Sequence, residues 1–195
     1  MRCEASEVLS GEAATVTVLL SGGADSAALL AQLLDGDLKP SALFVDYDQP
    51  ALAEERRASR GVARRMRVEW ASMTFKSTVT LPTTGEIRGR NAMLLAAADH
   101  ACPTDYVAIG VHGGTDYPDC SRAFIDAWQA VLDVQHGGAT RVLAPFLDLG
   151  KQDVLALAAK TPHLLEATYS CERAGGPCGK CLSCRDRARF EHADA

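Results

Sequence analysis

Apolar runs alternate with amphipathic segments along most of the 195-residue chain. Short apolar and β-branched runs predict strands at residues 15–20, 41–47, 67–73, 105–111 and 140–146. Apolar residues at helical spacing predict helices at about residues 25–34, 51–66, 90–101, 119–134 and 151–159, with a loop at 75–89. This alternation predicts an α/β fold, a doubly wound parallel sheet of about five strands with helices on both faces.

The first predicted strand runs directly into the loop Ser21-Gly22-Gly23-Ala24-Asp25-Ser26. A loop at a helix N-terminus offers free backbone N–H groups and the positive end of the helix dipole. Gly22 and Gly23 allow the backbone to approach an anion without a Cβ in the way, and the two serines add hydroxyl donors. Asp25 can cap the helix or help to hold Mg²⁺. We therefore predict phosphate binding, with a tight turn and an ordinary helix cap as the alternative; the Walker A pattern is absent.

The net charge and the lengths of the apolar runs exclude some classes of binding partner. The formal net charge is −5, which argues against nucleic acid because its binders usually carry a basic stripe. The charged segment at residues 54–67 has the spacing of a solvated helix face. No apolar run approaches the roughly 18 residues of a membrane span, and the acidic start of the chain does not resemble a signal peptide. We expect a cytoplasmic protein without a membrane partner.

Four of the seven cysteines lie close together near the C-terminus, in the order Cys171, Cys178, Cys181 and Cys184. Such a cluster favours metal binding over disulfides in a cytosolic chain. Four thiolates suit a tetrahedral Zn²⁺ site, which is structural because no coordination position stays open. An iron–sulfur cluster and reactive thiols are the alternatives. The composition changes near residue 168, so we expect a nucleotide-binding domain at residues 1–167 and a zinc-binding tail at 168–195, packed on the same domain.

The SGGxDS loop resembles the pyrophosphate-binding loop (PP-loop) of the N-type ATP pyrophosphatases. Five further segments are FVDYDQ (44–49), GRN (89–91), TDYPDC (115–120), GKQDV (150–154) and the tail CGKCLSCRDRA. Together with the loop they resemble QueC, the 7-cyano-7-deazaguanine synthase family, over about residues 15–190. The resemblance implies an adenine nucleotide α-hydrolase-like fold. It also implies an AMP-forming C–N ligase that activates the carboxylate of 7-carboxy-7-deazaguanine with ATP, releases pyrophosphate, and uses ammonia to form the amide and then the nitrile.

The resemblance also assigns roles to residues. The ATP phosphates, with Mg²⁺, are expected at Ser21, Gly22, Gly23, Asp25 and Ser26. The deazaguanine and adenylate pocket is expected at Arg90, Asn91, Tyr117, Asp119 and Lys151. Asp25, Lys151 and Asp119 are the expected catalytic residues, with Asp119 accepting hydrogen bonds from the guanine-like edge and Lys151 neutralising phosphate charge. The alternatives are a helix cap for Asp119, packing for Tyr117 and a helix-terminal ion pair for Arg90.

Several positions depart from the family pattern. Asp48 replaces a glycine, Pro50 and Ala51 replace a basic pair, and the 75–89 loop is short. These substrate-side changes leave a second hypothesis open: a QueC-like enzyme of bacterial antiphage defence that joins the deazaguanine to an amine of a partner protein. A tRNA-modifying enzyme and a non-enzymatic zinc module rank lower. The resemblance also allows a homodimer. His112 alone among the five histidines follows a strand near the expected pocket, and neither it nor Cys120 receives a role.

Overall fold

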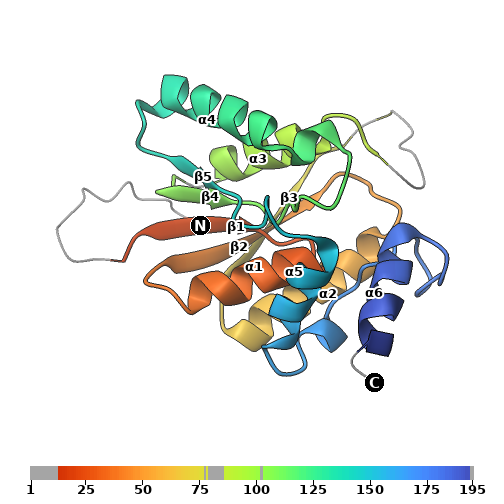
Figure 1. Cartoon of the computed structure of the whole chain (residues 1–195). Helices are drawn as coiled ribbons and strands as arrows, with labels where there is room; N and C mark the ends of the chain where they lie inside the picture. The colour runs from red at the N-terminus through yellow and green to blue at the C-terminus, as the bar shows by residue number, and fades with distance from the viewer. Residues whose placement is uncertain (1–12, 77, 79–85, 102, 194–195) are drawn as a thin grey trace.

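The computed structural model describes residues 13–76, 78, 86–101 and 103–193. Its sheet has five parallel strands in the order β3-β2-β1-β4-β5 (Figure 1). The strands are β1 Thr15–Leu19, β2 Lys39–Asp46, β3 Trp70–Thr74, β4 Tyr106–Ala108 and β5 Arg141–Leu143. This arrangement confirms the predicted α/β fold with a doubly wound parallel sheet.

Helices cover both faces of the sheet (Figure 1). On one face lie α1 (Ala24–Leu34), α2 (Leu52–Met66) and α5 (Lys151–Ala159); on the other lie α3 (Arg90–Ala101) and α4 (Arg122–His136). Successive side chains of a strand point to opposite faces. Val16 and Val18 of β1 therefore enter the core beneath α1, whereas Leu19 joins the core beneath α3.

The chain reverses its direction of winding between β1 and β4. It runs outward from β1 to β3, then crosses through α3 to place β4 on the other side of β1. Loops that leave neighbouring strands in opposite directions at such a point leave a crevice at the carboxyl ends. At Gly110, just beyond β4, an added Cβ would lie 3.1 Å from the Asp25 carbonyl oxygen, so a glycine there lets the end of β4 approach the start of α1.

Element boundaries differ from the predicted ones where local geometry decides. Arg67 ends α2 in a left-handed conformation with φ 57°, so the third strand begins at Trp70 instead of residue 67. The helix expected at 119–134 begins later, because the 3₁₀ turn η1 (Pro118–Cys120) precedes α4. Ser121 caps α4 by accepting a hydrogen bond from the Phe124 amide at 3.2 Å.

The tail contains a helix that the sequence pattern did not predict, α6 (Leu182–Ala193). It packs beside α5 (Figure 1). Arg187 fixes it to the short turn η2 (Leu165–Ala167) by donating hydrogen bonds to Thr168 Oγ1 at 2.9 Å and to the Leu165 carbonyl at 2.5 Å. The division of the chain at residue 168 stays a prediction.

The charged helix α2 is only partly a solvated face. Arg56 pairs with Asp46 of β2, and the Arg60 guanidinium lies 5.8 Å from the Trp70 ring centroid. Glu54 accepts a hydrogen bond from the Gly175 amide of the tail at 2.9 Å. Several charged side chains that the sequence pattern places on a solvated helix face therefore bind neighbouring segments.

None of the described helices combines the length and the apolar character that crossing a bilayer requires. Most of the loop predicted at 75–89, the chain start, Cys3 and Cys102 lie outside the described residues.

Candidate active site

A cavity of about 310 Å³ opens at the carboxyl ends of β1, β2 and β4. Its walls come from the loop after β1, the residues after β2, the start of α3, the segment after β4, Lys151 and the C-terminal tail. Ligand pockets commonly span about 300–1,000 Å³, so the cavity has the size of a small-molecule site.

The loop after β1 is held by its own hydroxyl groups. Ser26 Oγ donates a hydrogen bond to the Gly23 carbonyl at 3.0 Å, and Ser21 Oγ accepts one from the Gly23 amide at 3.2 Å. The two hydroxyl oxygens lie 3.1 Å apart. Gly23 occupies the cap position of α1 without a side-chain cap. The N-terminus of α1 therefore reaches the cavity with backbone donors that an anion can accept from.

Gly22 packs closely against α2, a contact that the loop pattern did not predict. Its φ is +89°, and a Cβ there would lie 2.5 Å from the Glu55 carbonyl and 2.6 Å from the Ser59 amide nitrogen. Gly22 is not among the residues that line the cavity. The glycine is therefore required for close packing of the loop on α2, while Gly23 borders the cavity.

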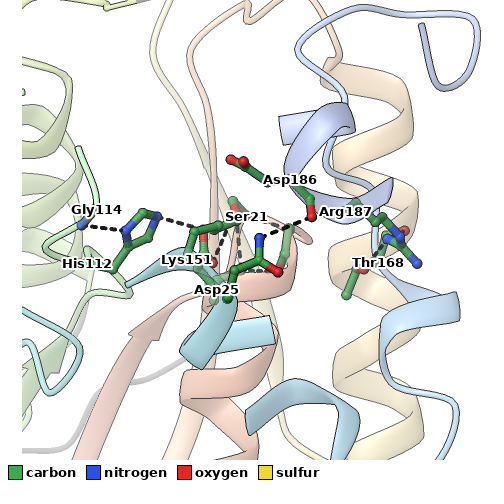
Figure 2. A network of polar contacts seen from close by, with 11 residues as sticks. Ser21, Asp25, His112, Gly114, Lys151, Thr168, Asp186 and Arg187 are labelled. Carbon is green, nitrogen blue, oxygen red and sulfur yellow. Dashed lines mark hydrogen bonds and ion pairs between the residues drawn. The ribbon is translucent and has the colours of Figure 1, made fainter. Parts of the chain in front are cut away.

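Asp25 and Lys151 join the N-termini of two adjacent helices. Lys151 Nζ lies 2.6 Å from Asp25 Oδ1 and 2.7 Å from Oδ2. Asp25 thus serves as an ion-pair partner and not as the cap of α1. Asp186 of α6 lies beside this pair, and His112 approaches it from the opposite side (Figure 2). The site gathers two carboxylates and one ammonium group around the loop after β1, residues 21–26, which is called the phosphate loop below because the sequence predicts phosphate binding there.

His112 follows β4, and 10% of its side chain is exposed. Its Nδ1 accepts a hydrogen bond from the Gly114 amide at 3.1 Å, and its Nε2 lies 4.0 Å from Asp25 Oδ2. Burial lowers the pKa of His112 below its ordinary value of 6.5; Asp25 opposes this shift, and the Lys151 charge adds to it. The imidazole is accordingly neutral at pH 7.

Sequence reasoning gave no role to the residues on the β2 side of the cavity. Gln49 donates hydrogen bonds to the Val45 carbonyl at 3.2 Å and to Glu55 Oε2 at 3.0 Å, and its Oε1 accepts from the Tyr47 amide at 2.9 Å. Burial raises the pKa of Glu55, opposed by the Gln49 hydrogen bond and by the charge of Arg90. The FVDYDQ motif already marked Gln49, whereas Glu55 was hidden among the charges of α2.

Asp48 adopts a φ of 62° beside these residues. This left-handed conformation explains why a glycine is usual at that position, and aspartate is among the few other residues that tolerate it. The substitution therefore keeps the backbone shape of the loop.

The segments GRN and TDYPDC contact each other directly. The Asn91 side-chain nitrogen donates to the Asp119 carbonyl at 2.9 Å, and the Asn91 amide donates to Asp119 Oδ2 at 3.1 Å. Arg90, Asn91 and Tyr117 line the cavity, but Asp119 does not. Its buried carboxylate caps the start of α3, whereas the cap alternative had placed it on the following helix.

The four tail cysteines converge. Their Sγ atoms all lie within 4.8 Å of one another. A tetrahedral Zn²⁺ with bonds of about 2.3 Å sets its sulfur atoms about 3.8 Å apart, so the cluster fits a single metal ion after small adjustments. Amide groups of Lys180 and Cys181 donate to the Cys178 sulfur at 3.4 and 3.3 Å and lower its pKa to about 6. Burial raises the pKa of Cys184 to about 12.

A comparison with solved structures identifies proteins of the same fold. The U34-tRNA thiolase NcsA of Methanococcus maripaludis, solved with its [4Fe-4S] cluster, matches with a TM-score of 0.56 at 16% identity, over 94% of this chain and 66% of that one. The likeness shows that the two chains share this α/β fold.

The sequence comparisons then give the family. The model of the queuosine biosynthesis protein QueC matches residues 74–193. The 7-cyano-7-deazaguanine synthase of Methanoculleus marisnigri is 32% identical, over 87% of this chain and 90% of the relative. Synthase 1 of Mesorhizobium japonicum is 39% identical over 52% of this chain and 47% of its own length. The match to that relative and to other rhizobial synthases spans about half of their length. The chain belongs to the QueC family.

Proposed function

We propose that this protein activates the carboxylate of 7-carboxy-7-deazaguanine with ATP. A carboxylate oxygen attacks the α-phosphorus, the bond from that phosphorus to the bridging oxygen breaks, and pyrophosphate leaves. Ammonia then attacks the acyl carbon, loses a proton and displaces AMP, which gives the amide. A second ATP activates the amide oxygen in the same way with release of pyrophosphate, and loss of both amide protons and of AMP gives 7-cyano-7-deazaguanine.

The phosphate loop and Lys151 provide the electrostatic part of this mechanism. Ser21, Gly23, Ser26 and the N-terminus of α1 bind the phosphates, because fixed backbone dipoles stabilise charge on a leaving pyrophosphate. Asp25 would hold the Mg²⁺ that accompanies ATP, and the Lys151 ammonium group would pair with the phosphate oxygens. Gly22 acts indirectly, by seating the loop on α2.

The start of α3 and the segment after β4 provide the substrate side. Arg90, Asn91 and Tyr117 line the cavity and contact the deazaguanine. Asp119 acts through Asn91, since its carboxylate holds the Asn91 amide. This replaces the direct substrate contact expected for Asp119 from the sequence.

We also propose that the four cysteines hold a structural Zn²⁺. The four sulfur atoms fill a tetrahedral set of ligands, and zinc in such a site orders the chain around it. The tail then forms a fixed wall of the cavity through Tyr169, Cys171 and Asp186.

The observation that carries the proposal is the Asp25–Lys151 pair beside the phosphate loop in a chain of the QueC family. The test is to incubate the pure protein with MgATP and 7-carboxy-7-deazaguanine, with and without ammonia. We expect pyrophosphate and AMP to depend on the carboxylate, and the nitrile to depend on ammonia. Pyrophosphate release that is indifferent to the carboxylate would contradict the substrate assignment.

A second candidate is transfer of the deazaguanine to an amine of a partner protein. It is supported by Pro50 and Ala51, which stand in place of the family's basic pair just beyond the cavity residue Gln49. Such a ligase would form the same adenylate but leave little free nitrile, and it would add a deazaguanine mass to a protein. Robust nitrile formation from carboxylate, ATP and ammonia alone would exclude it.

A further inference from the structure

His112 presents an unused hydrogen-bond donor to the cavity. The Gly114 amide occupies the lone pair of Nδ1, and a neutral imidazole carries its single proton on the other nitrogen. Nε2 is therefore the protonated atom. Its distance of 4.0 Å to Asp25 Oδ2 is too long for a hydrogen bond, and within the described residues no other acceptor engages it.

The turn after β4 holds the ring in this orientation. The Gly113 amide donates to the Leu149 carbonyl at 3.0 Å, which ties the turn to the segment before α5. A Cβ on Gly114 would lie 3.1 Å from His112 Nδ1 and 3.2 Å from the Lys151 amide nitrogen. The glycine thus lets its own amide approach the ring closely.

The charges around the ring come from three elements. Asp25 of α1 and Asp186 of α6 favour a protonated imidazole, whereas Lys151 of α5 and burial oppose it, and the net effect lowers the pKa. Protonation would place a proton on Nδ1, where it would meet the Gly114 N–H and break that hydrogen bond. This backbone contact therefore sets the tautomer, whereas burial is the largest cause of the lowered pKa of His112.

This geometry excludes a role as general base. A general base needs a free lone pair within reach of the proton that it removes. Nδ1 is occupied and Nε2 already carries its hydrogen, so the ring can only donate toward the cavity. The donor is directed to the Asp25–Lys151 pair (Figure 2), where the proposed function places the phosphates.

We propose that His112 is a catalytic residue that donates a hydrogen bond from Nε2 to a phosphoryl oxygen of ATP. This inference rests on the adenylation proposed above. His112 and Lys151 would stabilise charge on the transferring phosphate from two sides, the former as a dipole and the latter as a cation. No proton is transferred to or from the ring.

The first test is ¹⁵N NMR of the histidine rings in the wild-type protein, with the His112 signals assigned by their loss in His112→Gln. We expect the Nε2–H tautomer of the neutral ring at about pH 7 to pH 8, and a shift of the Nε2–H proton on addition of MgATP. The Nδ1–H tautomer, an imidazolium near pH 7, or an Nε2–H signal indifferent to MgATP would each overturn the proposal. The tautomer can be measured without turnover. Failure of this inference can therefore be distinguished from failure of the proposed reaction.

The second test compares two amide substitutions. The side-chain nitrogen of glutamine can occupy the place of Nε2, whereas that of asparagine is too short to reach it. We expect His112→Gln to keep pyrophosphate release within a few-fold of wild type and His112→Asn to lower it roughly ten- to hundredfold, as for a lost hydrogen bond to a charged group. His136→Gln on α4, outside the cavity, is the matched control. Equal loss in both His112 variants would contradict the donor role.

Discussion

The Tyr169 amide donates a hydrogen bond to the Gly22 carbonyl at 2.9 Å. This contact links the phosphate loop to the segment that precedes Cys171, the first cysteine of the C-terminal cluster. Tyr169 lies two residues before Cys171, and both line the cavity. The state of the cysteine cluster therefore bears directly on the loop that is proposed to bind ATP.

Loss of the metal should weaken both the fold and nucleotide binding. We expect about one zinc per chain by elemental analysis. Cys181→Ser should lower the free energy of unfolding by more than about 4 kcal/mol, the range typical of a lost metal site, and should weaken MgATP binding measured by calorimetry. Cys120→Ser, outside the cluster, is the control for metal content. A metal-free Cys181→Ser protein with wild-type stability would contradict a structural role.

Removal of the charge of Asp25 should abolish chemistry and spare the fold. Asp25→Asn keeps the shape of the side chain but loses the ion pair with Lys151 and the proposed Mg²⁺ ligand. We expect pyrophosphate release to fall by at least about 100-fold, the usual effect of removing one group that stabilises transition-state charge. Circular dichroism should be unchanged, and Asp37→Asn on an exposed turn should keep full activity. Near-normal turnover in Asp25→Asn would make the loop a structural turn.

Substitutions of Asp119 can show whether its carboxylate positions Asn91 or contacts the substrate directly. Asp119→Ala leaves the buried Asn91 amide without an acceptor, which should cost about 1–3 kcal/mol of unfolding free energy and raise the KM for the deazaguanine. Asp119→Asn retains an acceptor oxygen and should stay close to wild type in both respects. If Asp119→Asn instead loses substrate affinity as fully as Asp119→Ala, the carboxylate itself contacts the substrate.

The raised pKa of Glu55 gives stability a predictable dependence on pH. The folded protein holds this proton more tightly than the unfolded chain, so the contribution of Glu55 to stability is full below about pH 4.5 and is lost as pH rises through the folded-state pKa. Urea unfolding should therefore show Glu55→Gln gaining stability relative to wild type between pH 5 and pH 8. Glu69→Gln, on an exposed residue, controls for the lost charge. A difference that stays constant with pH would contradict the burial of a charged carboxyl.

Local sequence patterns predicted the parts of this molecule that depend on local chemistry. β-branched runs and the SGGxDS loop fixed the place of β1 and the start of α1, because strand periodicity and small residues act over a few positions. The spacing of the cysteines likewise predicted that they meet. The helix α6 was not predicted, since a segment rich in glycine and cysteine precedes it.

Local patterns could not predict the contacts between segments that are distant in the sequence. Nothing near Glu55 in the sequence shows that its side chain borders a cavity, because its immediate neighbours Glu54 and Arg56 are charged as well. The burial of Asp119 depends on Asn91, which lies 28 residues away in the chain. Gly22 is predicted to make room for phosphate, and the sequence does not show that the backbone of α2 also requires a glycine there.

The fate of the carboxylate oxygen tests the central claim most directly. Turnover of 7-carboxy-7-deazaguanine labelled with ¹⁸O in its carboxylate, with MgATP and ammonia, should give AMP that carries one ¹⁸O atom, measured by mass spectrometry. The label must reach AMP because the substrate oxygen attacks the α-phosphorus and stays on it when the acyl bond breaks. Unlabelled AMP, or ADP as the nucleotide product, would contradict activation of the carboxylate as an adenylate.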